Sequence, residues 1–323
     1  MSLNILITST SFMDTPGIHQ ETLAQYDLKL NYLRGPLDEA TMLNHIESYD
    51  ALICGDDALT ERVLGKGKNA KLKFVSKYGV GLDKIDLRTA QELGIPVTNC
   101  PGVNQVSVAE HFFAALLCYL RNIHLQFNEV QGKGLWTRMT GNEMYGKKLL
   151  IMGLGRIGSE IAKRAKAFGL QVYGYDQHPP ASLIEEGIIE MIDHLSSHFS
   201  QMDFVSLNLP LLPDTKHILS AELIQQAKKE LVVVNTARGE LVDQDALIEA
   251  LHNNTIGGYV TDVLDIEPMP SDHPLRYLPN VLITPHIGSR TFDSVQRQGM
   301  MAVQNLVDGL NIPLKNLNNS SLK

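Results

Sequence analysis

The stretch KKLLIMGLGRIGSEIAKRAKAFGLQVYGYD, residues 147–176, decides the fold class. It holds three glycines, Gly153, Gly155 and Gly158, in the pattern G-x-G-x-x-G. An apolar run precedes the pattern, a segment with helical periodicity follows it, and a second apolar run ends in Asp176. A strand, a glycine-rich turn, a helix and a second strand with a terminal carboxylate are the context in which this pattern binds a dinucleotide.

Each of these residues has a chemical reason to be where it is. Gly153 permits a tight turn, Gly155 lets backbone amides approach a pyrophosphate, and Gly158 lets the helix pack closely on the strand. The start of the helix presents free amides and the positive end of its dipole to the phosphates. We expect Asp176 to accept hydrogen bonds from the ribose hydroxyls. Its charge disfavours a 2′-phosphate and no arginine follows it, so NAD is favoured over NADP.

Short apolar runs alternate with helical segments along the whole chain, which is typical of parallel sheets with helices on both faces. The predicted strands are 4–9, 27–33, 51–54, 74–77, 97–99, 149–152, 171–175, 204–208, 231–235, 259–263 and 281–284. The stretch GIPVTNCPGVN, residues 94–104, is dense in turn residues and indicates a domain junction. Ser107 and Glu110 then predict a capping box ahead of a nearly all-apolar helix. Residues 291–310 predict one long final helix.

Composition excludes several classes of function. The chain of 323 residues is long enough for two domains. A net charge of −8 without a basic run argues against a nucleic-acid partner. No apolar stretch reaches the roughly 18 residues of a membrane span, so we expect no membrane partner. The start, MSLNILITST, predicts a strand and not a signal peptide.

The cysteines and histidines predict no metal site. Cys54, Cys100 and Cys118 form an odd set without metal-ligand spacing, which favours free thiols and a cytoplasmic location. The 11 histidines are scattered along the chain.

Three residues with reactive or charged side chains follow three successive predicted strands. Arg238 follows the run VVVN, Glu267 lies beyond the run GYVT, and His286 follows the run VLIT. In a doubly wound sheet these strand ends lie at the same edge as the glycine-rich loop. Each has a plainer alternative: a surface arginine, a solvated loop carboxylate and a loop histidine. Together, beside a dinucleotide fingerprint, they predict an oxidoreductase site.

The chain resembles the NAD-dependent D-isomer-specific 2-hydroxyacid dehydrogenases over nearly its whole length. The resemblance rests on KYGVGLDKIDL (77–87), NQVSVAEH (104–111), KLLIMGLGRIG (148–158), LNLPLLPDTKHIL (207–219), VNTARGELVDQDALIEAL (234–251), TDVLDIEP (261–268) and TPHIGS (284–289). It implies an α/β fold with two Rossmann-like doubly wound domains, the NAD-binding domain being inserted into a flavodoxin-like substrate domain. Residues 1–100 and 290–323 would form the substrate domain and residues 101–289 the NAD-binding domain. An arm at about 107–145 would mediate a homodimer.

The resemblance also implies roles for individual residues. His286 would be the general acid/base, and Glu267 would bind its far ring nitrogen and fix its tautomer. Arg238 would hold the substrate carboxylate together with the backbone amides of Val80 and Gly81. The implied cofactor contacts beyond the three glycines and Asp176 are Arg156, Ile157, Pro210, Thr215, Thr236, Ala237, Arg238, Asp262, His286 and Gly288.

The implied reaction is hydride transfer between NAD(H) and a small 2-oxo acid or its D-2-hydroxy acid. Two substrate pairs stay open, D-3-phosphoglycerate/3-phosphohydroxypyruvate and glyoxylate/hydroxypyruvate. Thr261 departs from the usual leucine of the family motif, and we expect no C-terminal regulatory extension and no serine feedback. The alternative is an NAD-responsive, corepressor-like binding protein, because such relatives keep the same three site residues.

Overall fold

The computed structural model describes residues 2–315, so Met1 and the polar tail 316–323 lie outside the described residues. The chain divides into two compact units. Unit 1 comprises the chain up to Asn104 and again from Arg290 onward, and unit 2 comprises Gln105–Ser289. The chain therefore leaves unit 1 once and returns to it once.

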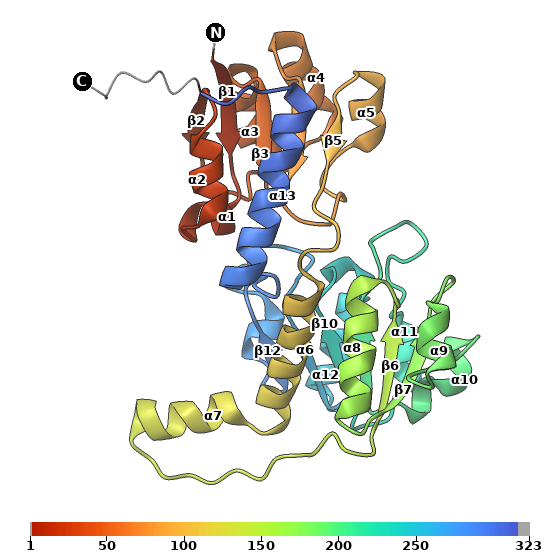
Figure 1. The fold of residues 1–323 in the computed structure, drawn as a ribbon. Helices are drawn as coiled ribbons and strands as arrows, with labels where there is room; N and C mark the ends of the chain where they lie inside the picture. Colours follow the sequence, from red (N-terminus) through yellow and green to blue (C-terminus); the bar gives the residue numbers. More distant parts are fainter. Residues whose placement is uncertain (1, 316–323) are drawn as a thin grey trace. The chain divides into compact units, whose positions relative to one another are not determined.

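Unit 1 contains a parallel sheet of five strands (Figure 1). In spatial order these are β2 (Leu28–Tyr32), β1 (Leu3–Ile7), β3 (Ala51–Cys54), β4 (Phe74–Lys77) and β5 (Val97–Thr98). The order 2-1-3-4-5 is the flavodoxin-like one, as the family resemblance implied. Its helices are α1 (Thr10–Asp14), α2 (Ile18–Ala24), α3 (Glu39–His45), α4 (Glu61–Ala70), α5 (Leu87–Glu92) and α13 (Phe292–Leu310).

Helices pack against both faces of this sheet. Successive strand residues point to opposite sides, so neighbouring residues enter different cores. Ile5 and Ile7 pack in one core with residues of α13, and Leu6 packs in the other with residues of α3 and α4. The hydroxyl of Ser76 in β4 donates to the Ala302 carbonyl of α13 over 2.8 Å. The last helix of the chain is therefore an integral part of the first unit.

Unit 2 contains a parallel sheet of seven strands. In spatial order these are β12 (Val281–Ile283), β11 (Gly258–Thr261), β10 (Val232–Asn235), β9 (Phe204–Leu207), β6 (Lys148–Met152), β7 (Gln171–Tyr175) and β8 (Glu190–Met191). Counted within the unit, the order is 3-2-1-4-5-6 with a seventh strand added, which is the order of a dinucleotide-binding sheet. The doubly wound α/β fold predicted from the sequence is confirmed.

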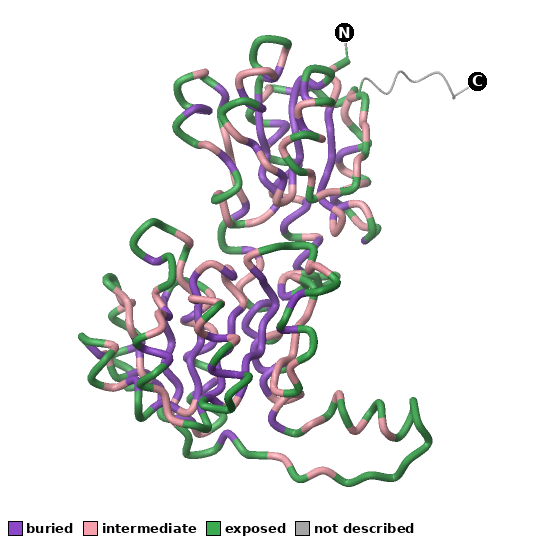
Figure 2. Tube along the Cα trace, turned by 180° about the vertical axis from the view of Figure 1, so that it is seen from behind, coloured by how far each residue is buried: buried purple, intermediate pink, exposed green. Residues whose placement is uncertain are grey.

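Helices cover both faces of the second sheet as well. They are α6 (Gln105–Leu120), α7 (Ile123–Phe127), α8 (Arg156–Ala167), α9 (Ala181–Glu185), α10 (Leu195–His198), α11 (Ala221–Gln226) and α12 (Gln244–His252). Leu149 and Ile151 of β6 pack with α6 and α8, whereas Leu150 and Met152 pack with α11 and α12. Figure 2 shows the central strands of each sheet among the most deeply buried parts of the chain, whereas the edge strands β2, β5, β8 and β12 hold no buried residue.

An arm extends from unit 2 after α6. It comprises α7, a π-helical turn at Asn128–Gly132 and an irregular segment up to about residue 143. Figure 2 shows the arm mostly exposed, with intermediate residues between the exposed ones. Its exposed side chains include large apolar ones, among them Phe127, Leu135 and Trp136, the last with 78% of its surface accessible.

Two details of the sequence-based prediction are wrong. Helix α6 begins at Gln105, so Ser107 lies inside the helix and is not part of a capping box; its hydroxyl donates to the Gly288 carbonyl instead. The short edge strand β8 was not predicted, because two residues give no detectable alternation of apolar and polar side chains.

The described residues hold no helix long and apolar enough to span a membrane. Residues 2–315 likewise hold no group of three His, Cys, Asp or Glu side chains that could bind a metal ion. All three cysteines are free thiols. Burial raises the pKa of Cys54 to about 12 and that of Cys100 to about 11, so these thiols are protonated at neutral pH.

Candidate active site

The candidate site lies along one edge of the sheet in unit 2. The carboxyl ends of six strands are aligned there by the hydrogen-bond register, and these end residues are Tyr175, Met152, Leu207, Asn235, Thr261 and Ile283. Neighbouring strands lie about 4.8 Å apart, so the ends of β10 and β12 are separated by about 10 Å. The residues that follow these ends include the glycine-rich loop, Asp176, Arg238 and His286.

The glycine-rich loop joins β6 to α8, and its three glycines have different surroundings. Gly153 has φ +96°, and a Cβ there would come within 2.7 Å of the Asn208 carbonyl carbon. A Cβ on Gly158 would collide with the Gly153 carbonyl oxygen. A Cβ on Gly155 would meet no atom within 4 Å. Close packing therefore requires glycine at the first and third positions, whereas the second glycine leaves open space in front of the N-terminus of α8.

Asp176 directly follows β7 and is tied to this loop. The backbone amide of Leu154 donates to Asp176 Oδ2 over 2.6 Å, and that of His178 donates to Oδ1 over 2.7 Å. A carboxylate has about four acceptor positions, so two remain for hydroxyl donors. The carboxylate thus holds the loop and can still bind a ribose.

Two buried polar atoms at this edge lack hydrogen-bond partners within the protein. They are Thr236 Oγ1, directly after β10, and Asn208 Oδ1, directly after β9. Buried polar atoms are normally satisfied, so unpartnered ones beside an open helix N-terminus fit a bound polar ligand. These atoms, the space in front of Gly155 and the carboxylate of Asp176 together fit a dinucleotide such as NAD.

The loop after β9 contains the next two predicted cofactor contacts. The Thr215 hydroxyl donates to the Pro210 carbonyl over 2.6 Å and accepts from the Leu212 amide over 2.8 Å. These bonds close residues 210–215 into a compact turn after β9, the strand that pairs with β6. Contact of Pro210 and Thr215 with the cofactor stays a prediction.

The turn that carries Arg238 is held by the buried side chain of Asn235. Asn235 Nδ2 donates to the Arg238 carbonyl over 2.8 Å, and Asn235 Oδ1 accepts from the Ala237 amide over 3.0 Å. A Cβ on Gly239 would collide with the backbone at Leu264, so the chain passes too closely for any larger residue. Arg238 is half-buried, and its Nη1 donates to the Ala237 carbonyl over 2.7 Å.

His286 and Glu267 form a direct pair. His286 Nδ1 lies 2.8 Å from Glu267 Oε2, and about a third of each side chain is exposed, 34% and 32%. The other carboxylate oxygen, Oε1, accepts from the Leu264 amide over 2.9 Å, which fixes the orientation of Glu267. The family resemblance implied this pair, and the structure brings the two side chains into contact.

Asp262 supports the backbone that carries His286. It is buried, and its carboxylate accepts from the Thr284 hydroxyl over 2.5 Å, the Ile287 amide over 2.8 Å and the Gly288 amide over 2.7 Å. The His286 amide donates to the Asp262 carbonyl over 2.9 Å. Asp262 and Gly288 were predicted as cofactor contacts; the bonds in the structure join them to each other, and the cofactor contact stays a prediction.

Val80 and Gly81 lie in unit 1, in the loop after β4. Asn99 Nδ2 donates to the Val80 carbonyl over 2.7 Å, and Gly79 beside it has φ +126°. The Lys77 ammonium, at the end of β4, donates to the Gly55 carbonyl and to Asp56. The expected contact of the Val80 and Gly81 amides with substrate stays a prediction.

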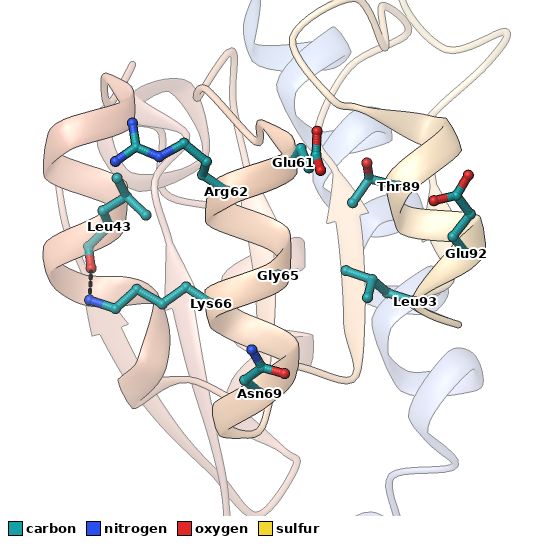
Figure 3. A pocket seen from close by; sticks show the side chains of 9 residues that line it. All are labelled: Leu43, Glu61, Arg62, Gly65, Lys66, Asn69, Thr89, Glu92 and Leu93. Atoms are coloured by element: carbon teal, nitrogen blue, oxygen red, sulfur yellow. Dashed lines mark hydrogen bonds between the residues drawn. The ribbon is translucent and has the colours of Figure 1, made fainter.

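A hollow of about 570 Å³ lies elsewhere in unit 1, beside α4, and none of the predicted site residues lines it (Figure 3). Arg62 and Lys66 extend from α4 toward α3, and Lys66 Nζ donates to the Leu43 carbonyl over 2.8 Å. Arg62 pairs with Glu39 at 3.2 Å. Charges of both signs are paired here, so we assign no ligand to this hollow.

Sequence reasoning missed four residues that shape the site: Ser107, His111, Asn235 and Thr284. Ser107 and His111 are four residues apart on α6 and both contact the segment 284–288. Helical spacing could have shown that they share a face, but not what that face touches. Asn235 follows an apolar run directly before the Arg238 turn, and an amide at a strand end is a recognisable turn signal.

Comparisons with known proteins agree with this geometry. Residues 113–288 match the family model described as "D-isomer specific 2-hydroxyacid dehydrogenase, NAD binding domain". The chain is 38% identical to D-3-phosphoglycerate dehydrogenase of Methanocaldococcus jannaschii, with 84% of this chain and 51% of that protein covered. It is 36% identical to hydroxypyruvate reductase of Thermotoga maritima, with 85% and 90% covered.

Solved structures include a similar fold. D-Lactate dehydrogenase of Aquifex aeolicus, determined with NAD and lactic acid, matches with a TM-score of 0.82 and 30% identity, covering 95% of this chain and 96% of that one. The chain spans about half the length of the archaeal phosphoglycerate dehydrogenase but nearly all of the hydroxypyruvate reductase. Fold, dinucleotide loop and relatives lead to one conclusion: the chain belongs to the D-isomer specific 2-hydroxyacid dehydrogenases, a family of NAD-dependent oxidoreductases.

Proposed function

We propose that the protein interconverts a small 2-oxo acid and its D-2-hydroxy acid, with NAD(H) as the redox partner. The observation that carries the proposal is the His286–Glu267 pair, at 2.8 Å, on the same sheet edge as the glycine-rich loop. A histidine fixed by a carboxylate is the usual group for moving one proton near neutral pH. Hydride transfer to a carbonyl needs such a proton, because the oxygen becomes a hydroxyl.

The geometry supports Nε2 as the ring nitrogen that moves the proton. An ionised carboxylate only accepts hydrogen bonds, so Glu267 holds a proton on His286 Nδ1. Proton exchange with substrate is then the task of Nε2. The protonated ring donates to the carbonyl oxygen in the reductive direction, and the neutral ring accepts the hydroxyl proton in the oxidative one.

Arg238 is proposed to bind the substrate carboxylate. Its guanidinium offers a planar fork of donors that matches a carboxylate, and Asn235 fixes the turn from which it projects. Bound NAD supplies the hydride acceptor, and NADH supplies the hydride donor. Gly153, Gly155 and the α8 N-terminus are proposed to hold its pyrophosphate.

The substrate pair stays a proposal with two members. The relatives named above are a D-3-phosphoglycerate dehydrogenase and a hydroxypyruvate reductase, and another relative, 34% identical, is a glyoxylate reductase of Korarchaeum cryptofilum. We therefore propose either 3-phosphohydroxypyruvate/D-3-phosphoglycerate or glyoxylate and hydroxypyruvate with their reduced forms. The backbone amides of Val80 and Gly81 are proposed to contribute to binding its carboxylate.

We also propose that the protein is a homodimer that pairs through the arm after α6. The support is the row of large apolar side chains that the arm exposes, Ile123, Leu125, Phe127, Leu135 and Trp136. Large apolar side chains that gather on an exposed segment mark interaction sites in soluble proteins. A second copy of the same arm or of the adjoining surface would bury it.

The test of the catalytic proposal is a cofactor-oxidation assay. The purified protein is mixed with NADH and, in turn, glyoxylate, hydroxypyruvate, 3-phosphohydroxypyruvate and pyruvate, and the absorbance of NADH is followed. His286→Ala should reduce turnover by at least about 100-fold, since general acid catalysis contributes 10²–10⁴-fold, while NADH binding persists. His252→Ala, at the end of α12 and away from the strand ends, is the matched control.

The outcomes separate the alternatives. Turnover that is unchanged in His286→Ala would refute the assigned role. Preference for the phosphorylated acid would identify 3-phosphohydroxypyruvate/D-3-phosphoglycerate as the substrate pair. Preference for glyoxylate or hydroxypyruvate would identify the protein as a reductase of these acids. NADH binding without turnover of any acid would favour the corepressor-like binding protein.

A further inference from the structure

His111 has no role in the reaction proposed above, yet it contacts the segment that carries His286. Its Nε2 lies 3.0 Å from the Thr284 hydroxyl and 3.5 Å from Asp262 Oδ1. His111 belongs to α6, whereas Thr284 follows β12, so the contact links a helix to a strand end 173 residues away. The side chains of His111 and Asp262 are largely buried, 16% and 3% exposed.

The donors and acceptors in this group define one chain of hydrogen bonds. The Thr284 hydroxyl donates its single proton to Asp262 Oδ1 over 2.5 Å. It can therefore only accept from His111, which requires the proton on His111 Nε2. The carboxylate at the end of the chain accepts from the amides of Ile287 and Gly288. The order is thus His111 to Thr284 to Asp262 to the backbone directly after His286.

The segment at the end of this chain needs such support. His286 has φ +54°, a left-handed conformation that costs energy for a residue with a Cβ. The Ser107 hydroxyl of α6 also donates to the Gly288 carbonyl over 2.9 Å. A Cβ on Gly288 would come within 2.9 Å of Asp262 Oδ2, so the backbone is pressed against the carboxylate. Helix α6 and Asp262 therefore both hold the backbone that carries His286.

We propose that His111 is a positioning residue for the reaction: through Thr284 and Asp262 it fixes the backbone at 286–288 and thereby the site of the His286 imidazole. This inference rests on the proposed function of His286. His111 does not touch the reacting atoms. Its contribution is geometric, and misplacement of a catalytic group by about 1 Å is enough to lower a rate about 100-fold.

The test compares variants that keep or remove one donor. His111→Leu removes the Nε2 donor, His111→Gln retains an N–H at a similar distance along the side chain, and Thr284→Val breaks the next link. We expect His111→Leu and Thr284→Val each to lower kcat about 10- to 100-fold, with the Kd for NADH changed by less than threefold. His111→Gln should recover most of the rate. The double variant that combines His111→Leu with Thr284→Val should have a kcat little lower than that of the slower single variant, because both substitutions break the same chain of hydrogen bonds.

The matched control is Tyr119→Phe. Tyr119 is also on α6, and its hydroxyl donates to the Gly257 carbonyl over 2.7 Å, before β11 and thus at the opposite edge of the sheet. This variant loses one hydrogen bond between α6 and the backbone of unit 2, yet kcat should stay within twofold of the wild type. Unfolding midpoints of all variants show which of them remain folded, and Thr284→Val serves if His111→Leu does not fold.

The outcomes distinguish this inference from the proposed function. If the wild type turns over none of the four acids, the proposed function fails, and imidazole NMR signals of His286 decide the inference. A shift of those signals in His111→Leu and Thr284→Val, but not in Tyr119→Phe, would support the positioning role, and unchanged signals would overturn it. In an active enzyme, wild-type kcat in His111→Leu, or equal loss in His111→Gln and His111→Leu, would overturn it.

Discussion

Substitution by alanine at two glycines three residues apart should affect two different properties, dinucleotide binding at Gly155 and stability at Gly158. A Cβ on Gly155 would lie in open space, whereas a Cβ on Gly158 would overlap the Gly153 carbonyl oxygen. Gly155→Ala should therefore leave the fold intact and impair dinucleotide binding. Gly158→Ala should destabilise unit 2, because a backbone carbonyl cannot move aside as a flexible side chain can.

The magnitudes follow from these surroundings. At Gly155, the N-cap of α8, alanine is a poorer cap by a few tenths to about 1 kcal/mol and gains a similar amount by restricting the unfolded chain. The net change in stability is then within about 0.5 kcal/mol. A methyl group in front of the helix N-terminus should cost one close amide–phosphate hydrogen bond, about 1.5–3 kcal/mol. NADH should bind about 10- to 150-fold more weakly.

At Gly158, overpacking costs about 3 kcal/mol, the upper end of the usual range, since the opposing atom is backbone. Alanine returns about 1 kcal/mol in helix propensity. The net loss of about 2 kcal/mol should lower the Tm by about 4–8 °C in a unit of this size. Thermal unfolding without cofactor and fluorescence titration with NADH measure the two effects, and each variant is the control for the other. Wild-type NADH affinity in Gly155→Ala would refute the assignment of this loop to the pyrophosphate, and wild-type stability in Gly158→Ala would refute its close packing.

Three further predictions concern other parts of the molecule. Asp176→Asn should reduce the preference for NADH over NADPH at least tenfold, because it removes the charge that repels a 2′-phosphate; an unchanged ratio of the two Kd values would show that another group selects the cofactor. Burial opposes ionisation of Asp203, but hydrogen bonds from the Lys148 amide and the Lys228 ammonium outweigh burial and lower the pKa of its carboxyl group. The ionised carboxylate therefore stabilises the folded protein at a pH above the unfolded pKa of about 3.9. This stabilisation is lost as the pH falls through the lowered pKa of the folded state. Asp203→Asn should thus cost roughly 1–2 kcal/mol at pH 7, much less at pH 2, as urea unfolding midpoints at the two pH values would reveal. Trp136→Ser should convert a dimer into monomers of about 35.8 kDa in light scattering, whereas a monomeric wild type would exclude the proposed pairing.

The strands and the edge they form were predictable because their signals are local. Apolar runs of four to six residues gave β3, β4 and β7 with their observed bounds and the other long strands to within a residue or two. Since parallel strands end at one edge, the residues after them could be grouped without knowing any contact. The pairing of His286 with Glu267 came from the family resemblance and not from these local signals.

The supporting contacts of the site were not predictable. Ser107 matched a helix-start pattern, yet the helix begins two residues earlier and its hydroxyl serves Gly288, 181 residues away. His111 and Thr284 are likewise joined only by the fold. The motif assigned an open approach to Gly155 and close packing to Gly158, but it could not tell that Gly153 lies against the backbone of Asn208. Such contacts depend on tertiary packing, which no local pattern encodes.

The split of unit 1 along the chain has a consequence for how the protein is made. Synthesis proceeds from the amino end, so β1 to β5 emerge long before α13, whose Ala302 carbonyl accepts from Ser76 and whose Gly309 lies against the Phe74 ring. Unit 2 is continuous and can complete its core while the last helix is still on the ribosome. Unit 1, although begun first, is finished last. The part of its apolar sheet face that α13 covers therefore stays exposed in the nascent chain until residues 292–310 arrive, and this interval is when aggregation or chaperone binding should be greatest.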